Sequence, residues 1–208
     1  MSADDGALRG WPEASLCAAE AADVRTTGLG QSALLLLDAI EVLAREQINY
    51  AVIGAMAASI HGVVRASVDA DAVLSLISKK PSDLERWFRA AGFQTELRVG
   101  DPADPIPALL QLTDHFGNRV DLLIGLRGLE TEAFSRALEV PFQGAVLRVI
   151  GREDFIAMKV FAGGPQDMAD AMNAISIADE SLDRVLLKRL TKRYGRDAVE
   201  NLNKLLGN

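Results

Sequence analysis

Cysteine is almost missing from this 208-residue chain, which carries Cys17 and no second thiol. An internal disulfide is therefore excluded, and the composition fits the reducing environment of the cytoplasm, where we expect the protein to work. Long hydrophobic runs are missing too, because the run over residues 33–37 ends at Asp38, far short of the roughly 18 apolar residues of a membrane helix. We therefore expect no membrane partner.

Positive charge is in short supply as well. Lys and Arg number 22 against 29 Asp and Glu, which gives a formal net charge of −7. Non-specific binding to nucleic acid depends on basic contacts to phosphates, so this balance argues against it as the main function but leaves room for a local basic patch. The first residues include Asp4 and Asp5 instead of a basic segment, so no signal peptide is expected.

What remains is the composition of a globular protein. Apolar residues make up 49% and charged residues 25%, which excludes a wholly disordered chain. The length corresponds to one main domain with a small addition. We expect a loose tail over residues 1–30, where no apolar period is sustained, then a mixed core over 31–150 and a helical part over 151–208.

The spacing of apolar residues predicts helices and strands in the core. In the first firm helix, 32–46, Leu36, Ile40 and Leu43 recur at i, i+4 and i+7. The further core elements expected are strand 50–53, helix 55–60, strand 67–76, helix 81–91, strand 93–99, a hairpin of 109–113 with 119–124, and strand 144–150. The helices expected in the last part are 153–162, 166–178, 181–193 and 198–206. This order predicts an α/β (α+β) fold, with a mixed sheet flanked by helices and a helical C-terminal part.

Asp69 and Asp71 are the sharpest feature of the sequence. Residues i and i+2 of a strand point to the same face, so the two carboxylates would lie about 7 Å apart on one side of strand 67–76. Their neighbours Ala70 and Ala72 are small and apolar, and carboxylates in such surroundings are costly unless something positive neutralises them. A divalent cation is the simplest partner, because hard cations bind carboxylate oxygens.

Asp121 is a third acid in an apolar strand, within the segment 119–124 (RVDLLI). If this strand lies beside the first, the three carboxylates converge. Such a cluster can hold two Mg²⁺ ions about 3.5–4 Å apart, an arrangement that clamps the attacking and leaving oxygens in nucleotidyl transfer. Asp69, Asp71 and Asp121 are therefore the candidate metal-binding and catalytic residues.

The segment before the acid pair suits a phosphate group. Gly54 and Ala55 join strand 50–53 to a short helix, the first N–H groups of a helix lack internal partners, and the helix dipole favours an anion there. Gly54 has no side chain to obstruct a phosphate, and Arg65, four residues before Asp69, would contact the same phosphates. A nucleoside triphosphate (NTP) held between amide donors and metal ions is thus the expected substrate.

Two motifs together resemble a known family. The segment 54–62 (GAMAASIHG), followed by 65–71 (RASVDAD), resembles the nucleotidyltransferases of the polymerase-β superfamily. The likeness is strongest to the minimal branch that includes abortive-infection (AbiE-type) toxins. A second segment, 158–170 (MKVFAGGPQDMAD), resembles that branch's K-x-x-A-G-R-P-K-D-x-x-D motif. The resemblance spans about residues 50–172, which is most of the structured chain.

The resemblance implies a reaction and its residues. A nucleotidyltransferase-like core would move a nucleoside monophosphate from an NTP to a hydroxyl of RNA, protein or a small molecule, with Mg²⁺ as cofactor. A toxin of this branch would pair with an antitoxin protein. The roles implied are metal ligation by Asp69 and Asp71 with Asp121 as the third carboxylate, triphosphate contact by Gly54 and Ala55, and nucleotide or acceptor contact by Lys159.

Two other functions stay open. Ala55 replaces the second glycine of the motif and Gly164 replaces its arginine, and both departures favour a non-catalytic module that binds a nucleotide or a partner on the same fold. The three acids oppose that interpretation. The other hypothesis is docking of an RNA stem or an antitoxin on the basic segment 184–196, whose cations share helix faces by i, i+4 spacing. A solvated helix face is the plainer interpretation of that segment.

Overall fold

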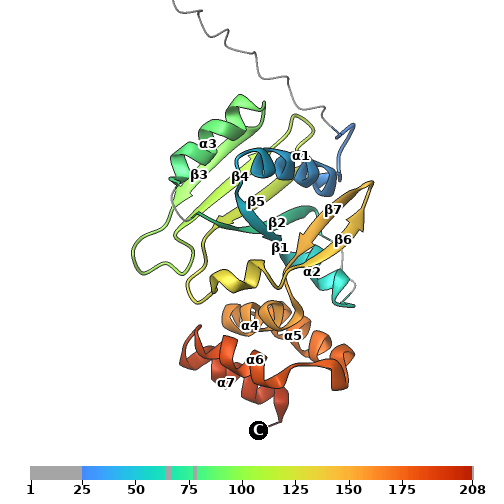
Figure 1. The fold of residues 1–208 in the computed structure, drawn as a ribbon, viewed down its shortest axis with the longest axis vertical. Helices are drawn as coiled ribbons and strands as arrows, with labels where there is room; N and C mark the ends of the chain where they lie inside the picture. Colours follow the sequence, from blue (N-terminus) through green and yellow to red (C-terminus); the bar gives the residue numbers. More distant parts are fainter. Residues whose placement is uncertain (1–24, 64–66, 77–78, 208) are drawn as a thin grey trace, which may run out of the picture.

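A mixed seven-stranded sheet forms the centre of the molecule (Figure 1). The computed structural model describes residues 25–63, 67–76 and 79–207. The strands are β1 (Asn49–Val52), β2 (Asp69–Ser75), β3 (Gln94–Val99), β4 (Ala108–Thr113), β5 (Arg119–Ile124), β6 (Leu138–Phe142) and β7 (Ala145–Val149). Their order across the sheet is β3-β4-β5-β2-β1-β7-β6. β2 and β5 are parallel neighbours, so the strand of the acid pair lies beside the strand of the third acid.

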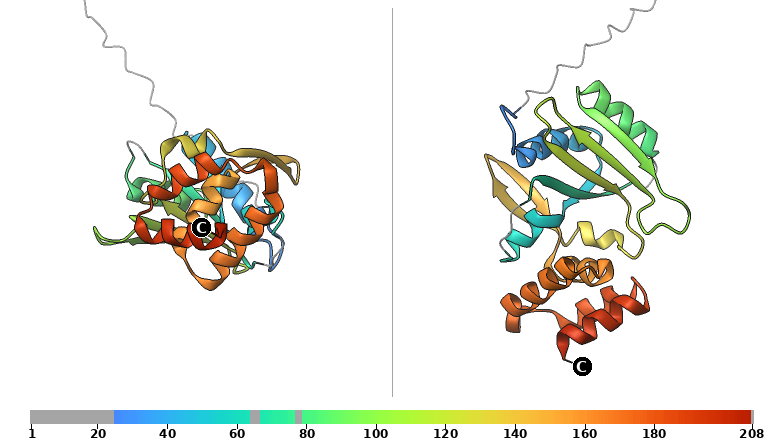
Figure 2. Two further views of the ribbon diagram at one scale, coloured as in Figure 1. Left: turned by 90° about the horizontal axis from the view of Figure 1, so that it is seen from below. Right: turned by 180° about the vertical axis from the view of Figure 1, so that it is seen from behind.

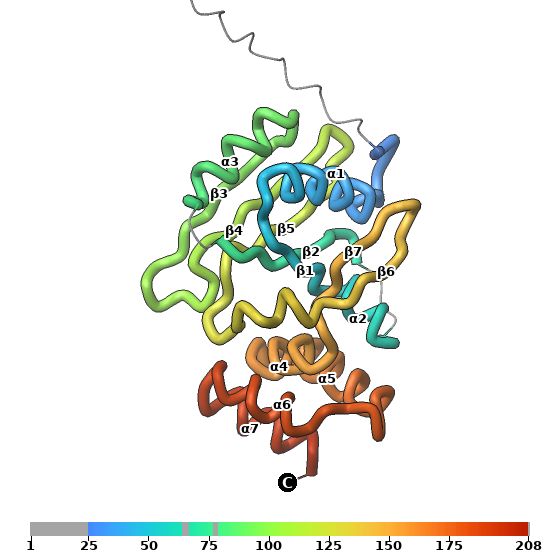
Figure 3. The backbone as a smooth tube through the Cα atoms, in the orientation of Figure 1, coloured from blue at the N-terminus to red at the C-terminus, as the bar shows by residue number. Residues whose placement is uncertain are grey.

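Some helices cover one face of this sheet, and others lie beyond one of its ends. The helices are α1 (Ser32–Arg45), α2 (Gly54–Ile60), α3 (Pro81–Ala90), α4 (Arg152–Ala162), α5 (Pro165–Ala178), α6 (Arg184–Lys192) and α7 (Arg196–Leu206), with short 3₁₀ turns η1 (Thr131–Phe134) and η2 (Asp179–Ser181). α1 and α3 lie against the sheet, while α4 to α7 gather at its lower end (Figures 1 and 3). Seen from behind, strands β2, β4 and β5 lie in front of α1 (Figure 2).

Alternation along the strands decides which side chains meet α1 and α3. The inward residues of the three central strands are fully or almost fully buried: Ala70, Ala72, Leu110, Leu112, Val120 and Leu122. They pack with the apolar faces of α1 and α3 in one core cluster. Successive side chains of a strand point to opposite faces, so Asp69, Asp71 and Asp121 face the side away from α1.

The predicted fold class is confirmed: a mixed sheet is flanked by helices and followed by a helical C-terminal part. β6 is the strand that the sequence pattern did not predict. It contains Pro141, which has no N–H to donate and lowers the expectation of a strand. β6 lies at the edge of the sheet, where a strand needs partners on one side alone, so the proline is tolerated there.

Helix α6 begins later than the apolar spacing predicts. The expected helix was 181–193, whereas α6 runs from Arg184 to Lys192. The Asp183 side chain accepts hydrogen bonds from the N–H groups of Val185 and Leu186 at 3.0 and 2.9 Å. This N-cap satisfies donors that the first turn leaves without partners and fixes the start of the helix.

The tail expected over residues 1–30 is described from Arg25 onward. Arg25 lies against α1, where its guanidinium pairs with Asp38 at 2.5 Å and also with Glu41. Burial raises the pKa of the Asp38 carboxyl despite that partner. Within the described ranges, no helix is both long and apolar enough to cross a membrane.

Candidate functional site

Three acids from two neighbouring strands share one face of the sheet. The parallel register of β2 and β5 pairs Asp71 with Asp121 and Asp69 with Arg119. Residues paired across neighbouring strands project to the same side, and so do residues i and i+2 of one strand. The sheet therefore gathers the carboxylates of Asp69, Asp71 and Asp121 into what we call the acid cluster.

Arg119 lies inside the acid cluster. Its Nη2 is 2.6 Å from Oδ2 of Asp69 and 3.3 Å from Oδ2 of Asp121. On the other side of Asp121, the Gln111 side chain of β4 donates a hydrogen bond to Oδ1 at 3.1 Å. Gln111 is the register partner of Asp121 across β4 and β5. The third acid is thus held from both sides by residues of its own sheet.

Gly54 lies directly against the carboxylate of Asp71. It joins β1 to α2 with φ of +63°, a left-handed conformation that glycine adopts without the strain of a side chain. A Cβ atom placed there would be 2.1 Å from Oδ2 of Asp71. The main chain reinforces this contact, because the N–H of Ile53 donates to the Asp71 carbonyl at 2.9 Å. A side chain at position 54 would therefore collide with the Asp71 carboxylate, while the expected phosphate contact of Gly54 stays a prediction.

Asp71 is a buried carboxylate with two acids beside it. Burial raises the pKa of its carboxyl above the ordinary value, and the charges of Asp121 and Asp69 raise it further. Lys159 and Arg119 act in the opposite direction without offsetting these effects. The raised pKa of Asp71 thus reflects first its removal from water and then the two acids beside it.

Two cavities border the acid cluster. The first, which we call the Asp71 cavity, has a volume of about 280 Å³. It is lined by Ile53, Gly54, Asp71, Leu123, Phe155, Met158, Lys159, Ala162 and Asp167. The second, the Asp69 cavity, has a volume of about 300 Å³ and is richer in hydroxyl groups. It is lined by Gly30, Ser32, Ala33, Ala55, Met56, Ser59, Ser67, Val68, Asp69 and Ala70. The acids thus lie between two spaces that can receive different ligands.

Lys159 projects from α4 into the Asp71 cavity, but its ammonium group is paired. Nζ lies 2.7 Å from Oδ1 of Asp167 and 3.0 Å from Oδ2 of Asp170, both on α5. It also lies 5.6 Å from the centre of the Phe155 ring. With 12% of its side chain exposed, Lys159 is held in place, and its position facing Asp71 is preorganised.

The structure places the predicted residues as follows. Gly54 and Asp71 are in contact, and Lys159 lines the same cavity. Ala55 is buried at the start of α2 and lines the Asp69 cavity instead. Arg65 lies outside the described residues. The acid cluster thus brings the three aspartates and Gly54 together, while Ala55 and Lys159 lie on opposite sides of it.

Sequence reasoning missed Arg119 and Gln111. Arg119 precedes Asp121 by two residues, so the strand period that placed Asp69 and Asp71 on one face also puts Arg119 beside Asp121. That signal was present in the sequence. Gln111 could be found only from the register of the hairpin, which sequence spacing does not fix at single-residue precision.

A divalent cation fits the chemistry of these residues. In the described part of the chain, no three His, Cys, Asp or Glu side chains are grouped closely enough to hold a metal ion. Carboxylate oxygens are nevertheless the donors that Mg²⁺ prefers, and burial beside two other acids raises the pKa of Asp71. Nη2 of Arg119 already contacts the carboxylates of Asp69 and Asp121.

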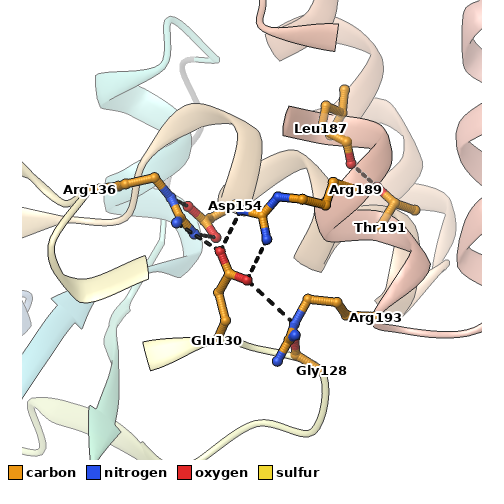
Figure 4. A network of polar contacts seen from close by, with 8 residues as sticks. All are labelled: Gly128, Glu130, Arg136, Asp154, Leu187, Arg189, Thr191 and Arg193. Atoms are coloured by element: carbon orange, nitrogen blue, oxygen red, sulfur yellow. Dashed lines mark hydrogen bonds and ion pairs between the residues drawn. The ribbon is translucent and has the colours of Figure 1, made fainter. Parts of the chain in front are cut away.

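Some cations of the basic segment 184–196 form ion pairs within the protein (Figure 4). Arg189 forms two hydrogen bonds with the carboxylate of Glu130, at 2.7 and 2.8 Å. Arg193 lies 3.7 Å from the same carboxylate and donates to the Gly128 carbonyl at 2.9 Å. Arg189 and Arg193 share a helix face as expected, and both contact Glu130 while about half of each side chain stays exposed. The surface left for an acidic partner is correspondingly smaller.

Glu130 is the centre of a junction between the sheet and the C-terminal helices. Besides Arg189 and Arg193 it binds Arg136 at 2.8 Å, and Arg136 in turn forms two hydrogen bonds with Asp154 of α4. Both acids are buried. Hydrogen bonds from Arg189 and Arg136 hold the pKa of Glu130 at about 2.

Comparison with known proteins shows that the sheet and its flanking helices have a nucleotidyltransferase-like fold. No family model and no curated protein matches the chain. Among solved structures, the antibiotic-resistance factor ANT(2'')-Ia in solution matches with a TM-score of 0.53 and 13% identity, over 76% of this chain and 87% of that one. ANT(2'')-Ia in complex with adenylyl-2''-tobramycin matches with a TM-score of 0.51 and 15% identity, over 77% and 97%.

A protein of Thermotoga maritima assigned to the nucleotidyltransferases is also similar, with a TM-score of 0.50 and 16% identity, over 67% of this chain and 89% of that one. At these identities the likeness concerns the fold. This chain covers most of each of these structures.

Proposed function

We propose that this protein is a metal-dependent nucleotidyltransferase that moves a nucleoside monophosphate from an NTP to a hydroxyl group. The observation that carries the proposal is the register of β2 and β5, which pairs Asp71 with Asp121 on the face that also carries Asp69. The fold shared with nucleotidyltransferases supports it. So does the raised pKa of Asp71, which is caused by burial and then by the charges of Asp121 and Asp69.

The reaction forms one bond and breaks one. The acceptor oxygen bonds to the α-phosphorus of the NTP, the bond from that phosphorus to the bridging oxygen of the β-phosphate breaks, and pyrophosphate leaves. The acceptor hydroxyl gives up its proton, and Asp121 is the carboxylate proposed to assist that transfer. Gln111 orients Asp121 by donating to Oδ1, so the other oxygen faces Arg119 and the open side of the sheet.

Asp69, Asp71 and Asp121 would hold the divalent ions. When bound, Mg²⁺ would neutralise the phosphate oxygens and lower the pKa of the acceptor hydroxyl. Gly54 serves this set by leaving room for the Asp71 carboxylate, since any larger residue would collide with Oδ2. Lys159 faces Asp71 across the same cavity and is proposed to bind the phosphates or the acceptor.

The two cavities give the substrates separate places. The Asp71 cavity offers an ammonium group and an aromatic ring, which suit a nucleotide. The Asp69 cavity offers hydroxyl groups, which suit a hydroxyl-bearing acceptor. One neighbour in fold carries an adenylylated antibiotic, adenylyl-2''-tobramycin, which supports a small-molecule acceptor; the sequence likeness to AbiE-type toxins supports RNA or protein instead, with an antitoxin as partner.

A labelled-transfer assay tests the proposal. The full chain is incubated with each α-labelled NTP, Mg²⁺ and a cell extract, and label is sought in the RNA, protein and small-molecule fractions. We expect transfer by the wild type and by Asp197→Asn, which changes an exposed acid of α7, and none by Asp71→Asn. Absence of label from every fraction with all four NTPs would contradict the proposal.

A nucleotide- or partner-binding module without catalysis is the second candidate. The ion pairs of Lys159 and of Arg119 favour it, because both cations are already engaged by carboxylates of the protein. Calorimetric titration with Mg²⁺ and a non-hydrolysable NTP separates the two functions when combined with the transfer assay. Binding that depends on Asp71, in the absence of any transfer, would establish the module.

A further inference from the structure

Arg119 is the cation that the acid cluster already contains. A single nitrogen, Nη2, contacts Oδ2 of Asp69 and Oδ2 of Asp121, at 2.6 and 3.3 Å. The two carboxylates share this nitrogen in the way that two carboxylates share a metal ion. Any divalent ion that uses the same two oxygens must therefore compete with the guanidinium for them.

The hydrogen bonding of the Arg119 guanidinium is incomplete. Its Nε is buried, and among the described residues it has no hydrogen-bond partner. An unpaired buried donor is costly, so the present position does not satisfy Arg119 fully. At the same time 40% of the side chain is exposed, which leaves it a route towards solvent.

The backbone at this position is fixed, so any change is confined to the side chain. Arg119 begins β5 and pairs in register with Asp69 of β2 and Thr113 of β4. Its N–H donates to Oγ of Ser32, the first residue of α1, at 3.0 Å. The guanidinium can therefore leave the acid cluster by rotation about side-chain bonds while the strand stays in place.

We propose that Arg119 is a displaceable internal cation, which holds Asp69 and Asp121 together when no divalent ion is bound and yields their oxygens when one binds. This inference rests on the proposed metal-dependent function. An arginine stays charged at every relevant pH, so it cannot yield by losing a proton and must move. Once displaced, its charge and its free Nε–H lie at the rim of the cluster, where a phosphate group of the substrate would meet them.

The test measures metal affinity directly. Mn²⁺ is titrated into the nucleotide-free protein and free Mn²⁺ is followed by electron paramagnetic resonance. Removal of the competing charge in Arg119→Gln is expected to tighten Mn²⁺ binding by about tenfold. Arg98→Gln is the matched control, because Arg98 lies on β3, two strands from β5, and pairs with Glu96; we expect a change below about twofold.

Thermal unfolding gives a second readout. In EDTA, Arg119→Gln leaves Asp69 and Asp121 without their shared cation and should lower Tm relative to the wild type. Mn²⁺ should raise the Tm of the variant by more than it raises that of the wild type. Arg119→Lys keeps the charge and should resemble the wild type in both measurements. Equal or weaker Mn²⁺ binding by a folded Arg119→Gln would overturn the inference.

One more variant separates this inference from the proposed function. If Asp71→Asn binds Mn²⁺ as well as the wild type does, the metal site itself is refuted. If Asp71→Asn loses Mn²⁺ while Arg119→Gln matches the wild type, the metal site stands and the displaceable cation is refuted.

Discussion

The acid cluster and the Glu130 junction are both made of carboxylates and arginines, but their charges are balanced in opposite ways. At the junction, three arginines surround Glu130 and Asp154, and the pKa of Glu130 falls to about 2. In the cluster, among the described residues, Arg119 pairs with Asp69 and Asp121 but not with Asp71, and the pKa of Asp71 rises. Each acid of the junction thus has an arginine partner, whereas in the described part of the cluster Asp71 has none.

This difference separates stability from function. Acids whose partners are all supplied by the protein stabilise the folded state and offer nothing to a ligand. Acids that are gathered without enough partners cost stability, and they persist where that strain serves binding or catalysis. Mutations in the two regions should therefore have opposite effects on stability and activity.

The largest expected effect is at Asp71. Asp71→Asn should lower nucleotidyl transfer by about a thousandfold, since it removes a metal ligand worth several kcal/mol in the transition state. Because the pKa of Asp71 is raised in the fold, its ionisation opposes folding above its ordinary pKa. The variant should therefore have a higher Tm than the wild type at pH 7 without metal, as measured by calorimetry. A lower Tm of the variant at pH 7 without metal would contradict the difference between Asp71 and Glu130 described above.

Gly54→Ala should come next in size. The new methyl group would meet Oδ2 of Asp71 and would also strain a backbone with φ of +63°. We expect transfer to fall by about a hundredfold, because small displacements of a catalytic group carry such costs. Gly92→Ala is the control, as Gly92 also has positive φ but open space around it; it should lose some stability and keep its activity. Equal activity losses in both variants would show that strain, not the collision with Asp71, is responsible.

Glu130→Gln should destabilise the protein by about 2 kcal/mol, less than a fully buried pair would, because its arginine partners are partly exposed. The pKa of Glu130 is lowered to about 2, so its contribution is present above about pH 4.5 and disappears as the pH falls towards 2. The difference in Tm between wild type and variant should shrink over that range. A difference that stays constant would mean that the ion pairs contribute nothing.

The smallest effects compare neighbouring cations of α6. Arg189→Gln removes two hydrogen bonds to Glu130 and should lower Tm by a few degrees. Lys188→Gln should leave it unchanged, because Lys188 is exposed. If Lys188→Gln lowers Tm by more than Arg189→Gln does, the assignment of Arg189 to the junction is wrong. Loss of binding to an acidic partner in Lys188→Gln would instead revive the docking hypothesis.

Local pattern was enough to predict most of the fold. The apolar period predicted a helix over 32–46, and α1 runs from Ser32 to Arg45. Strand alternation placed Asp69 and Asp71 on one face of the sheet. These features depend on residues a few positions apart, which sequence spacing resolves. β6 was missed because Pro141 weakens the strand pattern and only the sheet edge makes it acceptable.

Long-range partners could not be predicted in the same way. Glu130 stands alone in a loop, and its partner Arg189 is 59 residues away, so nothing near either residue indicates the pair. The ion pairs of Lys159 with Asp167 and Asp170 cross between two helices, α4 and α5. Asp167 nevertheless lies in the same motif as Lys159, eight residues later. The motif was interpreted as a ligand contact for Lys159, and the pairing with Asp167 and Asp170 depends on how α4 packs against α5.

The Glu130 junction also determines how the chain can be divided. Arg136 and Glu130 precede residue 150, while Asp154, Arg189 and Arg193 follow it, so the boundary between the core and the helical part runs through a set of shared charges. A fragment that ends at residue 150 would expose a buried carboxylate stripped of two counter-ions. We therefore expect neither part to be stable alone. A replacement C-terminal segment would need two arginines placed to pair with Glu130.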